Sequence, residues 1–370
     1  MIPVNEPLLD GNEKKYLEEC IDTGWISSEG PFVKKFEEEF SKRAGRKFGI
    51  AVCNGTAALE AAVIAAGIGK GDEVIMPAFT IISCASAVIR AGGMPVLVDS
   101  DPETWNMDVG QIEDKITSRT KAIMAVHIYG LPVDMEPLQK LALKYELKII
   151  EDAAELIGQT YNGKQCGSFG DVSTFSFYPN KHITTGEGGM ILTDDVETAE
   201  RCRSLRNLCF QSGKRFVHDE LGFNFRMTNL QAALGMAQFE RLDEFIEKKR
   251  HIGKMYNEGL KDLKSIRLPL EKTEYSDNIY WVYGIVIKKE TGINAVKAMK
   301  KLADQKIGTR PFFYPMHLQP VFKKMDLFVN ENYPVSEELS EMGFYIPSGL
   351  AISNDQIDRT IGSIRAIFKN

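Results

Sequence analysis

Short apolar runs alternate with segments of helical periodicity from the first residues to about residue 195. Each run is rich in β-branched or aromatic side chains and ends at glycine, proline, asparagine or an acidic residue, which is typical of buried strands. The expected strands are residues 48–52, 73–76, 95–98, 122–126, 147–151, 172–177 and 190–193. Strands that alternate with helices in this way predict an α/β domain.

The pattern changes after the seventh run. Residues 229–263 keep a single amphipathic helical periodicity, which predicts a long helix that connects two domains. A strand-like run at 280–287, a helix at 294–305 and a last helix from about residue 354 predict a smaller α+β domain. We expect a large domain at 1–245, including the first part of the connecting helix, and a small domain at 246–370.

Composition narrows the class of protein. The chain has 370 residues, of which 44% are hydrophobic, so it can build two full cores, and its net charge of −6 offers no electrostatic case for nucleic acid binding. No segment approaches the roughly 18 apolar residues of a membrane span. The six cysteines show neither paired metal-ligand spacing nor the density of a secreted scaffold. We expect a cytoplasmic protein with reduced thiols that uses no metal and associates with no membrane.

The segment around Lys181 carries the strongest chemical signal. Lys181 follows the strand at 172–177 and precedes the glycine-rich turn at 186–189, so it projects from a loop at a strand end. A lysine amine held beside a cofactor that lowers its pKa can form a Schiff base, which is how enzymes bind pyridoxal phosphate (PLP). A surface lysine in a hairpin loop is the alternative for a lone lysine.

Two further strand ends carry matching signals. After the strand at 48–52, the turn at Gly55 and the hydroxyl of Thr56 open a helix whose free N–H groups can bind phosphate, although Thr56 can equally be an ordinary N-cap. After the strand at 147–151, Asp152 can pair with a protonated pyridine nitrogen, although acids also favour helix N-termini. Three such elements in this order point to a PLP site.

These motifs resemble the fold-type I PLP enzymes and, within them, the DegT/DnrJ/EryC1/StrS family of nucleotide-sugar aminotransferases. The resemblance covers nearly the whole chain and includes the segments 9–13, 24–28, 54–58, 71–75, 125–130, 151–155, 222–229 and 310–317. It implies a seven-stranded, mostly parallel sheet. It also implies PLP as the cofactor, glutamate as the amino donor and a GDP-linked or UDP-linked 4-keto-6-deoxy sugar as the acceptor.

The resemblance also assigns residues. Lys181 becomes the Schiff-base lysine, Asp152 the partner of the pyridine nitrogen, and Glu155 the contact to the ring hydroxyl. Asn224 matches a position that reaches the phosphate from the neighbouring subunit, which implies a homodimer with shared active sites. The expected cofactor-binding residues are Gly55, Thr56, Ala57, Ile81, Asp152, Glu155, Ser176, Lys181 and Asn224, and the expected substrate-binding residues are Trp25, Tyr314 and His317.

One position departs from the family pattern. The family often places an aromatic residue against the pyridine face where this chain has Ile81. An aliphatic side chain can cover the ring by dispersion contact, and Phe79 is the alternative if the backbone register differs. Some family members replace the lysine by histidine and are dehydratases. Because Lys181 is present, we favour an aminotransferase. Adjacent residues in an extended or turn segment point in different directions, so we take His182 as a residue that supports the fold or the site and not as the reacting group. A PLP-containing regulator is a third, weaker alternative.

Overall fold

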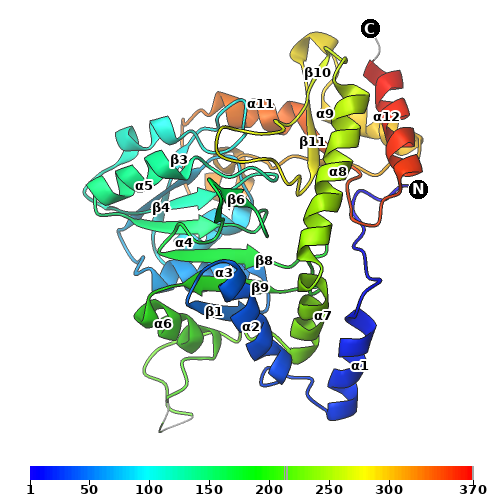
Figure 1. Cartoon of the computed structure of the whole chain (residues 1–370). Helices are drawn as coiled ribbons and strands as arrows, with labels where there is room; N and C mark the ends of the chain where they lie inside the picture. The colour runs from blue at the N-terminus through cyan, green and yellow to red at the C-terminus, as the bar shows by residue number, and fades with distance from the viewer. Residues whose placement is uncertain (212, 214–215, 369–370) are drawn as a thin grey trace.

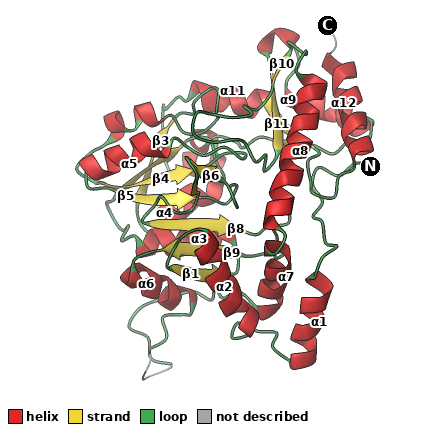
Figure 2. Ribbon diagram, in the orientation of Figure 1, coloured by secondary structure: helices red, strands yellow, loops and turns green. Residues whose placement is uncertain are grey.

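Seven strands form the central sheet of the molecule, seen in the computed structural model in Figures 1 and 2. The structure describes residues 1–211, 213 and 216–368. In spatial order the strands are β1 (Phe48–Val52), β9 (Gly189–Thr193), β8 (Val172–Ser176), β5 (Lys148–Asp152), β4 (Thr120–Val126), β2 (Glu73–Pro77) and β3 (Met94–Val98). Only β9 runs antiparallel to its neighbours in this sheet. The seven predicted strands and the mostly parallel sheet are confirmed.

Helices cover both faces of this sheet (Figure 2). Alternate strand side chains point to opposite faces, so Ile50 and Val52 enter one core while Ala51 enters the other. The first core contains helices α3 (Gly55–Ala65), α4 (Ile82–Arg90) and α6 (Val196–Arg206). The second contains helices α2 (Pro31–Arg43), α5 (Met135–Lys144) and α7 (Asn229–Phe239). The result is a three-layer α/β arrangement.

The prediction of one continuous helix over 229–263 is wrong, because the chain forms two helices there. Helix α7 ends at Phe239 and α8 (Leu242–Leu260) starts after a break at Glu240 and Arg241. Two side chains at the start of helix α1 (Glu13–Thr23) stabilise the chain at this break. Asn12 Nδ2 and Tyr16 OH donate to the Glu240 carboxylate at 2.9 and 2.6 Å. The expected boundary between residues 245 and 246 falls inside α8 and stays a prediction.

A second, antiparallel sheet lies beyond α8. Its order is β10 (Ile266–Arg267), β11 (Tyr283–Ile287), β13 (Gly343–Ile346) and β12 (Arg310–Pro311). The helices of this region are α9 (Ala295–Asp304), α10 (Pro320–Lys323), α11 (Pro334–Met342) and α12 (Asn354–Phe368). A small hairpin, β6 (Thr160–Tyr161) and β7 (Lys164–Gln165), stands apart from both sheets. The predicted strand at 280–287 is therefore shorter than expected, and the two predicted helices are present.

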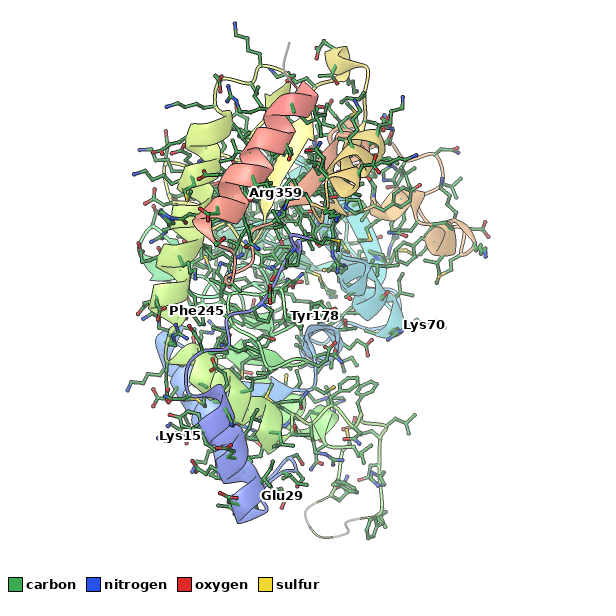
Figure 3. All side chains as sticks on the ribbon, turned by 90° about the vertical axis from the view of Figure 1, so that its right-hand side faces the viewer. Lys15, Glu29, Lys70, Tyr178, Phe245 and Arg359 are labelled. Atoms are coloured by element: carbon green, nitrogen blue, oxygen red, sulfur yellow. The ribbon has the colours of Figure 1, made fainter. Side chains whose placement is uncertain are left out.

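The first residues of the chain run along this second sheet. Ile2 pairs with Ile307, and Ser348 N donates to Val4 O at 3.1 Å. Figure 3 shows this N-terminal segment rising from α1 towards α12, on which Arg359 is labelled. The N-terminus thus lies beside the start of α12 (Figure 1). Within residues 1–211, 213 and 216–368, no helix has both the length and the apolar character needed to cross a membrane.

Candidate active site

The chemical signals at three strand ends converge on one cavity. Strands β5 and β8 are parallel, and β1 runs in the same direction because both β1 and β8 are antiparallel to β9, so their carboxyl ends share one edge of the sheet. The cavity there has a volume of about 790 Å³. Its lining includes eight of the expected cofactor-binding residues, namely Gly55, Thr56, Ala57, Ile81, Asp152, Glu155, Ser176 and Lys181.

Lys181 points into this cavity from the loop after β8. Its side chain is only 10% exposed, and Nζ lies 3.8 Å from Glu155 Oε1 and 3.7 Å from the ring centroid of Trp281. Burial lowers the pKa of Lys181, while the nearby carboxylates of Glu155 and Asp152 act in the opposite direction. The alternative of a surface lysine is therefore wrong, and the amine is held in a setting that favours its reactive, neutral form.

Two buried carboxyl groups face the same space. Asp152 Oδ1 accepts from Ala154 N at 3.1 Å, and Oδ2 accepts from the Cys84 thiol at 3.4 Å. Burial raises the pKa of Asp152, and burial likewise raises the pKa of Glu155 to about 8. A positively charged ring nitrogen beside either group would favour its ionised form. This end of the cavity is therefore suited to a cationic heterocycle.

The opposite end is suited to an anion. Asn54 caps α3, since its Oδ1 accepts from Ala57 N at 2.8 Å, so the alternative with Thr56 as N-cap is wrong. The Thr56 hydroxyl instead lies 2.9 Å from the Ser83 hydroxyl in the first turn of α4. Two helix N-termini with hydroxyl groups thus meet here, which favours phosphate binding.

Gly55 is required at this end by close packing. A Cβ added to Gly55 would lie 2.7 Å from Ser176 Cβ, below any ordinary contact distance. The glycine therefore lets the start of α3 approach the end of β8.

The residues of the cavity fit PLP. Thr174 Oγ1 and Asn180 Oδ1 are buried without a hydrogen-bond partner among the described residues, and both residues line the cavity. Buried polar atoms are nearly always partnered, so these two favour a ligand that supplies partners. A lysine, a buried carboxylate and an anion pocket correspond to the aldehyde, the ring nitrogen and the phosphate of PLP.

Ile81 lines the cavity where the family often has an aromatic residue. Phe79 is fully buried and packs against Tyr129, Phe312 and Phe313, with ring centroids 5.7 to 6.0 Å apart, and it is not among the lining residues. The alternative that Phe79 covers the ring is therefore wrong. Ile81 remains the residue expected to cover the pyridine ring.

Four expected residues lie outside the cavity of their own chain. Asn224 is exposed and pairs through its backbone with Asn207. Trp25 and Tyr314 are 50% and 51% exposed. His317 is buried against the ring of Tyr333, and its Nε2 lies 2.8 Å from Glu337 Oε1. The binding roles of these four stay predictions.

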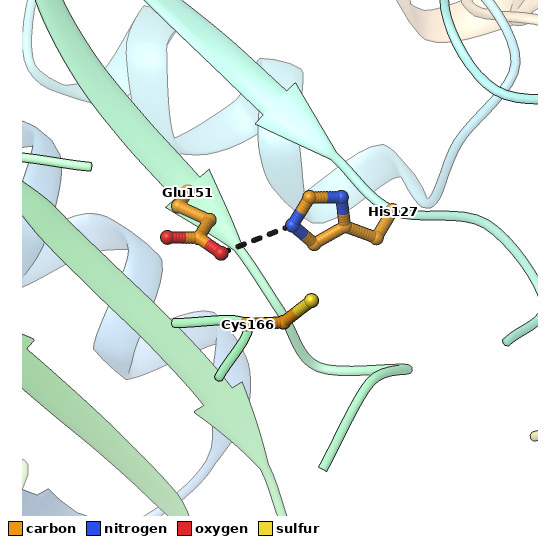
Figure 4. Close-up of side chains that lie close together, drawn as sticks. All are labelled: His127, Glu151 and Cys166. Carbon is orange, nitrogen blue, oxygen red and sulfur yellow. Dashed lines mark hydrogen bonds and ion pairs between the residues drawn. The ribbon is translucent and has the colours of Figure 1, made fainter. Parts of the chain in front are cut away.

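A buried cluster of His127, Glu151 and Cys166 lies beside the site (Figure 4), and its ligand-type atoms are all within 4.8 Å of one another. Val133 N donates to His127 Nδ1 at 3.0 Å, so the proton sits on Nε2 and is donated to Glu151 Oε1 at 3.1 Å. The other Glu151 oxygen accepts from Phe169 N and Gly170 N, in the segment that leads into β8. Because these bonds engage both ring nitrogens of His127 and both carboxylate oxygens of Glu151, we interpret the cluster as a structural contact that fixes the ends of β4 and β5.

The lining residues that sequence reasoning missed include Ser83, Trp281 and Arg310. Ser83 could have been found as a hydroxyl in the first turn of a helix after a strand end. Trp281 and Arg310 reach the cavity from around the second sheet, and no local pattern ties them to Lys181. His182, adjacent to Lys181, is fully buried outside the lining, and its Nε2 lies 3.2 Å from Ile279 O.

Comparison with known proteins agrees with this geometry. The profile described as "DegT/DnrJ/EryC1/StrS aminotransferase family" matches residues 7–365. The GDP-perosamine synthase of Escherichia coli O157:H7 is 42% identical over 369 residues, which cover 100% of this chain and 99% of that protein. The crystal structure of the aminotransferase TlmJ from Streptoalloteichus hindustanus superposes with a TM-score of 0.92 at 29% identity, covering 99% of this chain and 98% of that one.

A solved structure in its PLP form is also similar. The putative sugar aminotransferase Spr1654 from Streptococcus pneumoniae has a TM-score of 0.92 at 26% identity and covers 100% of this chain and 98% of that chain. These neighbours confirm the predicted fold class, that of the fold-type I PLP enzymes.

Proposed function

The chain belongs to the DegT/DnrJ/EryC1/StrS aminotransferase family and is a PLP-dependent enzyme, and from that premise we propose that it transfers an amino group from glutamate to the C4 ketone of a nucleotide-linked 4-keto-6-deoxy sugar. The acceptor we propose is GDP-4-keto-6-deoxymannose and the product GDP-perosamine, by analogy with the similar GDP-perosamine synthases. The single observation that carries the aminotransferase role is the buried Lys181 amine at the shared strand edge.

The residues of the cavity have different roles in the proposed reaction. PLP, when bound, supplies the electron sink and carries the amino group. Lys181 Nζ takes the proton from the α-carbon of glutamate, and in the second half of the cycle it delivers a proton at C4 of the sugar. Asp152 would hold a positive charge on the ring nitrogen of PLP, and Thr56, Ser83 and Ser176 would bind its phosphate. Presence of the lysine favours this reaction over a dehydration.

The mouth of the cavity is suited to anionic substrates. The guanidinium of Arg90 pairs with Glu60, whereas the exposed side chain of Arg310 makes no ion pair or hydrogen bond with other described residues. Both proposed substrates carry anionic groups, the carboxylates of glutamate and the diphosphate of the nucleotide. Trp25 and Tyr314 are exposed aromatic residues available to a nucleotide base.

The decisive test of the reaction class is product analysis. The purified holoenzyme is incubated with glutamate and GDP-4-keto-6-deoxymannose, and both products are identified by mass spectrometry. We expect 2-oxoglutarate and an amino sugar in equal amounts. A sugar that has lost an oxygen without gaining nitrogen would establish a dehydratase, and no turnover at all with any keto sugar would favour a regulator.

Preference for the nucleotide is a separate prediction. A pocket with buried polar partners for guanine leaves them unpaired with uracil, so we expect kcat/KM for the GDP sugar to exceed that for the matching UDP sugar by about a hundredfold or more. Both constants are measured with saturating glutamate. A clear preference for the UDP sugar would replace the acceptor and leave the aminotransferase assignment unchanged.

We further propose that the active unit is a homodimer in which each site is completed by the neighbouring subunit. Two features support it: Asn224 does not line its own cavity, and it lies on the segment between α6 and α7. The same segment exposes Val217 and Leu221, at 53% and 93%. Exposed apolar side chains of this kind favour burial against a partner.

Mixed dimers test the sharing of sites. Lys181→Ala and Asn224→Asp chains, each inactive alone, are co-refolded in equal amounts; half of the dimers are then mixed and each has one intact site. We expect about a quarter of the wild-type activity. As a control, a chain with both substitutions is mixed with wild-type chain, which gives inactive mixed dimers if sites are shared. Active monomers in dilute solution would contradict the proposal.

The compartment is proposed to be the cytoplasm. None of the six cysteines forms a disulfide, which supports a reducing environment.

A further inference from the structure

Trp281 forms a wall of the Lys181 cavity. It precedes β11, and its side chain is buried, with 4% exposed. The Lys181 Nζ atom lies over the indole, 3.7 Å from the ring centroid. An ammonium group over the face of a tryptophan is stabilised by the ring quadrupole, and tryptophan is the most effective of the aromatic residues in this contact.

The indole is held in place by several contacts. Its Nε1 donates to Asn180 O at 2.8 Å, and Asn180 directly precedes Lys181. The buried Lys249 ammonium donates to Trp281 O at 2.8 Å and to Ser348 O at 2.6 Å, which anchors the Trp281 backbone to the second sheet region. One residue therefore contacts both the backbone that leads into Lys181 and the amine at its tip.

The charged groups around the amine come from other elements. Glu155 lies 3.8 Å away on the loop after β5, Asp152 lies at the end of β5, and the Cys84 thiol faces the amine from α4. Glu155 and Asp152 are themselves buried, and burial raises the pKa of each. Because burial favours the neutral form of each carboxyl group, it weakens the support that either group gives to an ammonium. The uncharged indole face stabilises a cation without having to be ionised itself.

We propose that Trp281 is a positioning residue that stabilises the Lys181 amine as an ammonium during the part of the transfer cycle in which the free amine carries the proton taken from the substrate. The proposal rests on the proposed role of Lys181. A lysine stem has several rotatable bonds, and a released ammonium in a buried cavity is penalised by desolvation. The indole reduces the cost of ordering the lysine stem because it fixes the amine near the atoms between which the proton moves. It reduces the cost of desolvation because its ring face stabilises the positive charge.

The first test uses cofactor-free protein, so it does not depend on turnover. The pKa of Lys181 is measured by competitive acetylation over a range of pH, with mass spectrometry of the Lys181 peptide. Because the indole stabilises the charged form, its loss must lower this pKa. We expect Trp281→Leu to lower it by about half a unit to one and a half units, and Trp281→Phe by less.

A matched control separates this effect from a general loss of packing. Trp105 is equally buried, at 2%, and packs against Tyr129 and Phe312, but it does not line the cavity. Trp105→Leu is expected to lower thermal stability and leave the pKa of Lys181 unchanged. If Trp281→Leu fails to fold, the indoles are fluorinated instead in a Trp25→Phe, Trp105→Phe background, which keeps the shape and the N–H of Trp281. Each added fluorine should lower the pKa further.

The second test uses the holoenzyme. With Trp281→Leu we expect kcat to fall by about ten- to a hundredfold, with KM for glutamate changed by less than about threefold, since the residue acts on the lysine and not on substrate affinity. An unchanged Lys181 pKa in the leucine or fluorinated protein would overturn the proposal, as would an equal shift in Trp105→Leu. If Lys181 proves not to bind the cofactor, the pKa shift still appears and only the proposed function fails.

Discussion

Replacement of Lys181 by alanine is expected to remove the visible absorption of the cofactor-lysine Schiff base and to reduce turnover by at least about a thousandfold. Lys181 is the only lysine among the described residues that line the cavity, so no neighbouring amine can replace it. Absorption spectra of the purified protein and steady-state rates with glutamate and the keto sugar check both parts of the prediction.

The same substitution should leave the protein folded. Burial lowers the pKa of Lys181 and raises the pKa of Glu155 to about 8, so at neutral pH the cavity does not depend on a strong ion pair. We expect the melting temperature of the cofactor-free protein to change by only about a few degrees. An unfolded variant would make the loss of activity uninformative about catalysis.

Two controls sharpen the result. Lys181→Arg keeps the positive charge but cannot lose its proton, so it should be as inactive as the alanine variant. Lys148→Ala removes an exposed lysine that pairs with Asp171 at 3.0 Å on the surface, and it should keep nearly full activity. Sustained multiple turnover by Lys181→Ala would reject the central assignment.

The strands were predictable because their signals are local. Each of the seven strands predicted for the central sheet begins and ends within two residues of the observed one, since buried β-branched runs are bounded by turn residues in the sequence itself. The break between α7 and α8 was not predictable, because the amphipathic pattern continues through it. Its cause is distant: Glu240 accepts from Asn12 and Tyr16, and Arg241 pairs with Asp10.

The site likewise contains residues that the sequence predicts and residues that it does not. Lys181, Asp152 and Thr56 stand directly after strands, and parallel strands bring their carboxyl ends to one edge, so a correct reading of the strands is enough to bring these residues together. Trp281 enters the cavity only because the second sheet packs over that edge, and sequence spacing holds no information on that packing.

The N-cap of α3 shows a further limit of prediction from the sequence. Both Asn54 and Thr56 are good N-cap residues, and propensity alone does not choose between them. In the structure Asn54 is the N-cap, since its Oδ1 accepts from Ala57 N. The Thr56 hydroxyl is therefore not used for capping and lies beside the Ser83 hydroxyl. A difference of two residues in the cap thus decides whether a hydroxyl is available to the cavity.

Replacement of Asp152 by asparagine is expected to cut the rate by about a thousandfold, with a smaller effect on folding. A neutral amide cannot hold a positive charge on the ring nitrogen as a carboxylate does, and a loss of about 4 kcal/mol of transition-state stabilisation corresponds to that factor. Asparagine has nearly the same shape, and its Oδ1 can still accept from Ala154 N. Single-turnover rates with glutamate measure the effect on chemistry apart from product release.

Comparison with the two neighbouring acids decides whether Asp152 has this role. Glu151 does not line the cavity and accepts from Phe169 N, Gly170 N and His127, so Glu151→Gln should lower the free energy of unfolding more than it lowers the rate per folded molecule. Glu155→Gln should have an intermediate effect on the rate, because Glu155 Oε1 lies 3.8 Å from Lys181 Nζ and its loss would alter the environment of that amine. If Asp152→Asn turned over near normally while Glu155→Gln lost about a thousandfold, the electron-sink role would pass to Glu155, because that carboxyl group also lines the cavity.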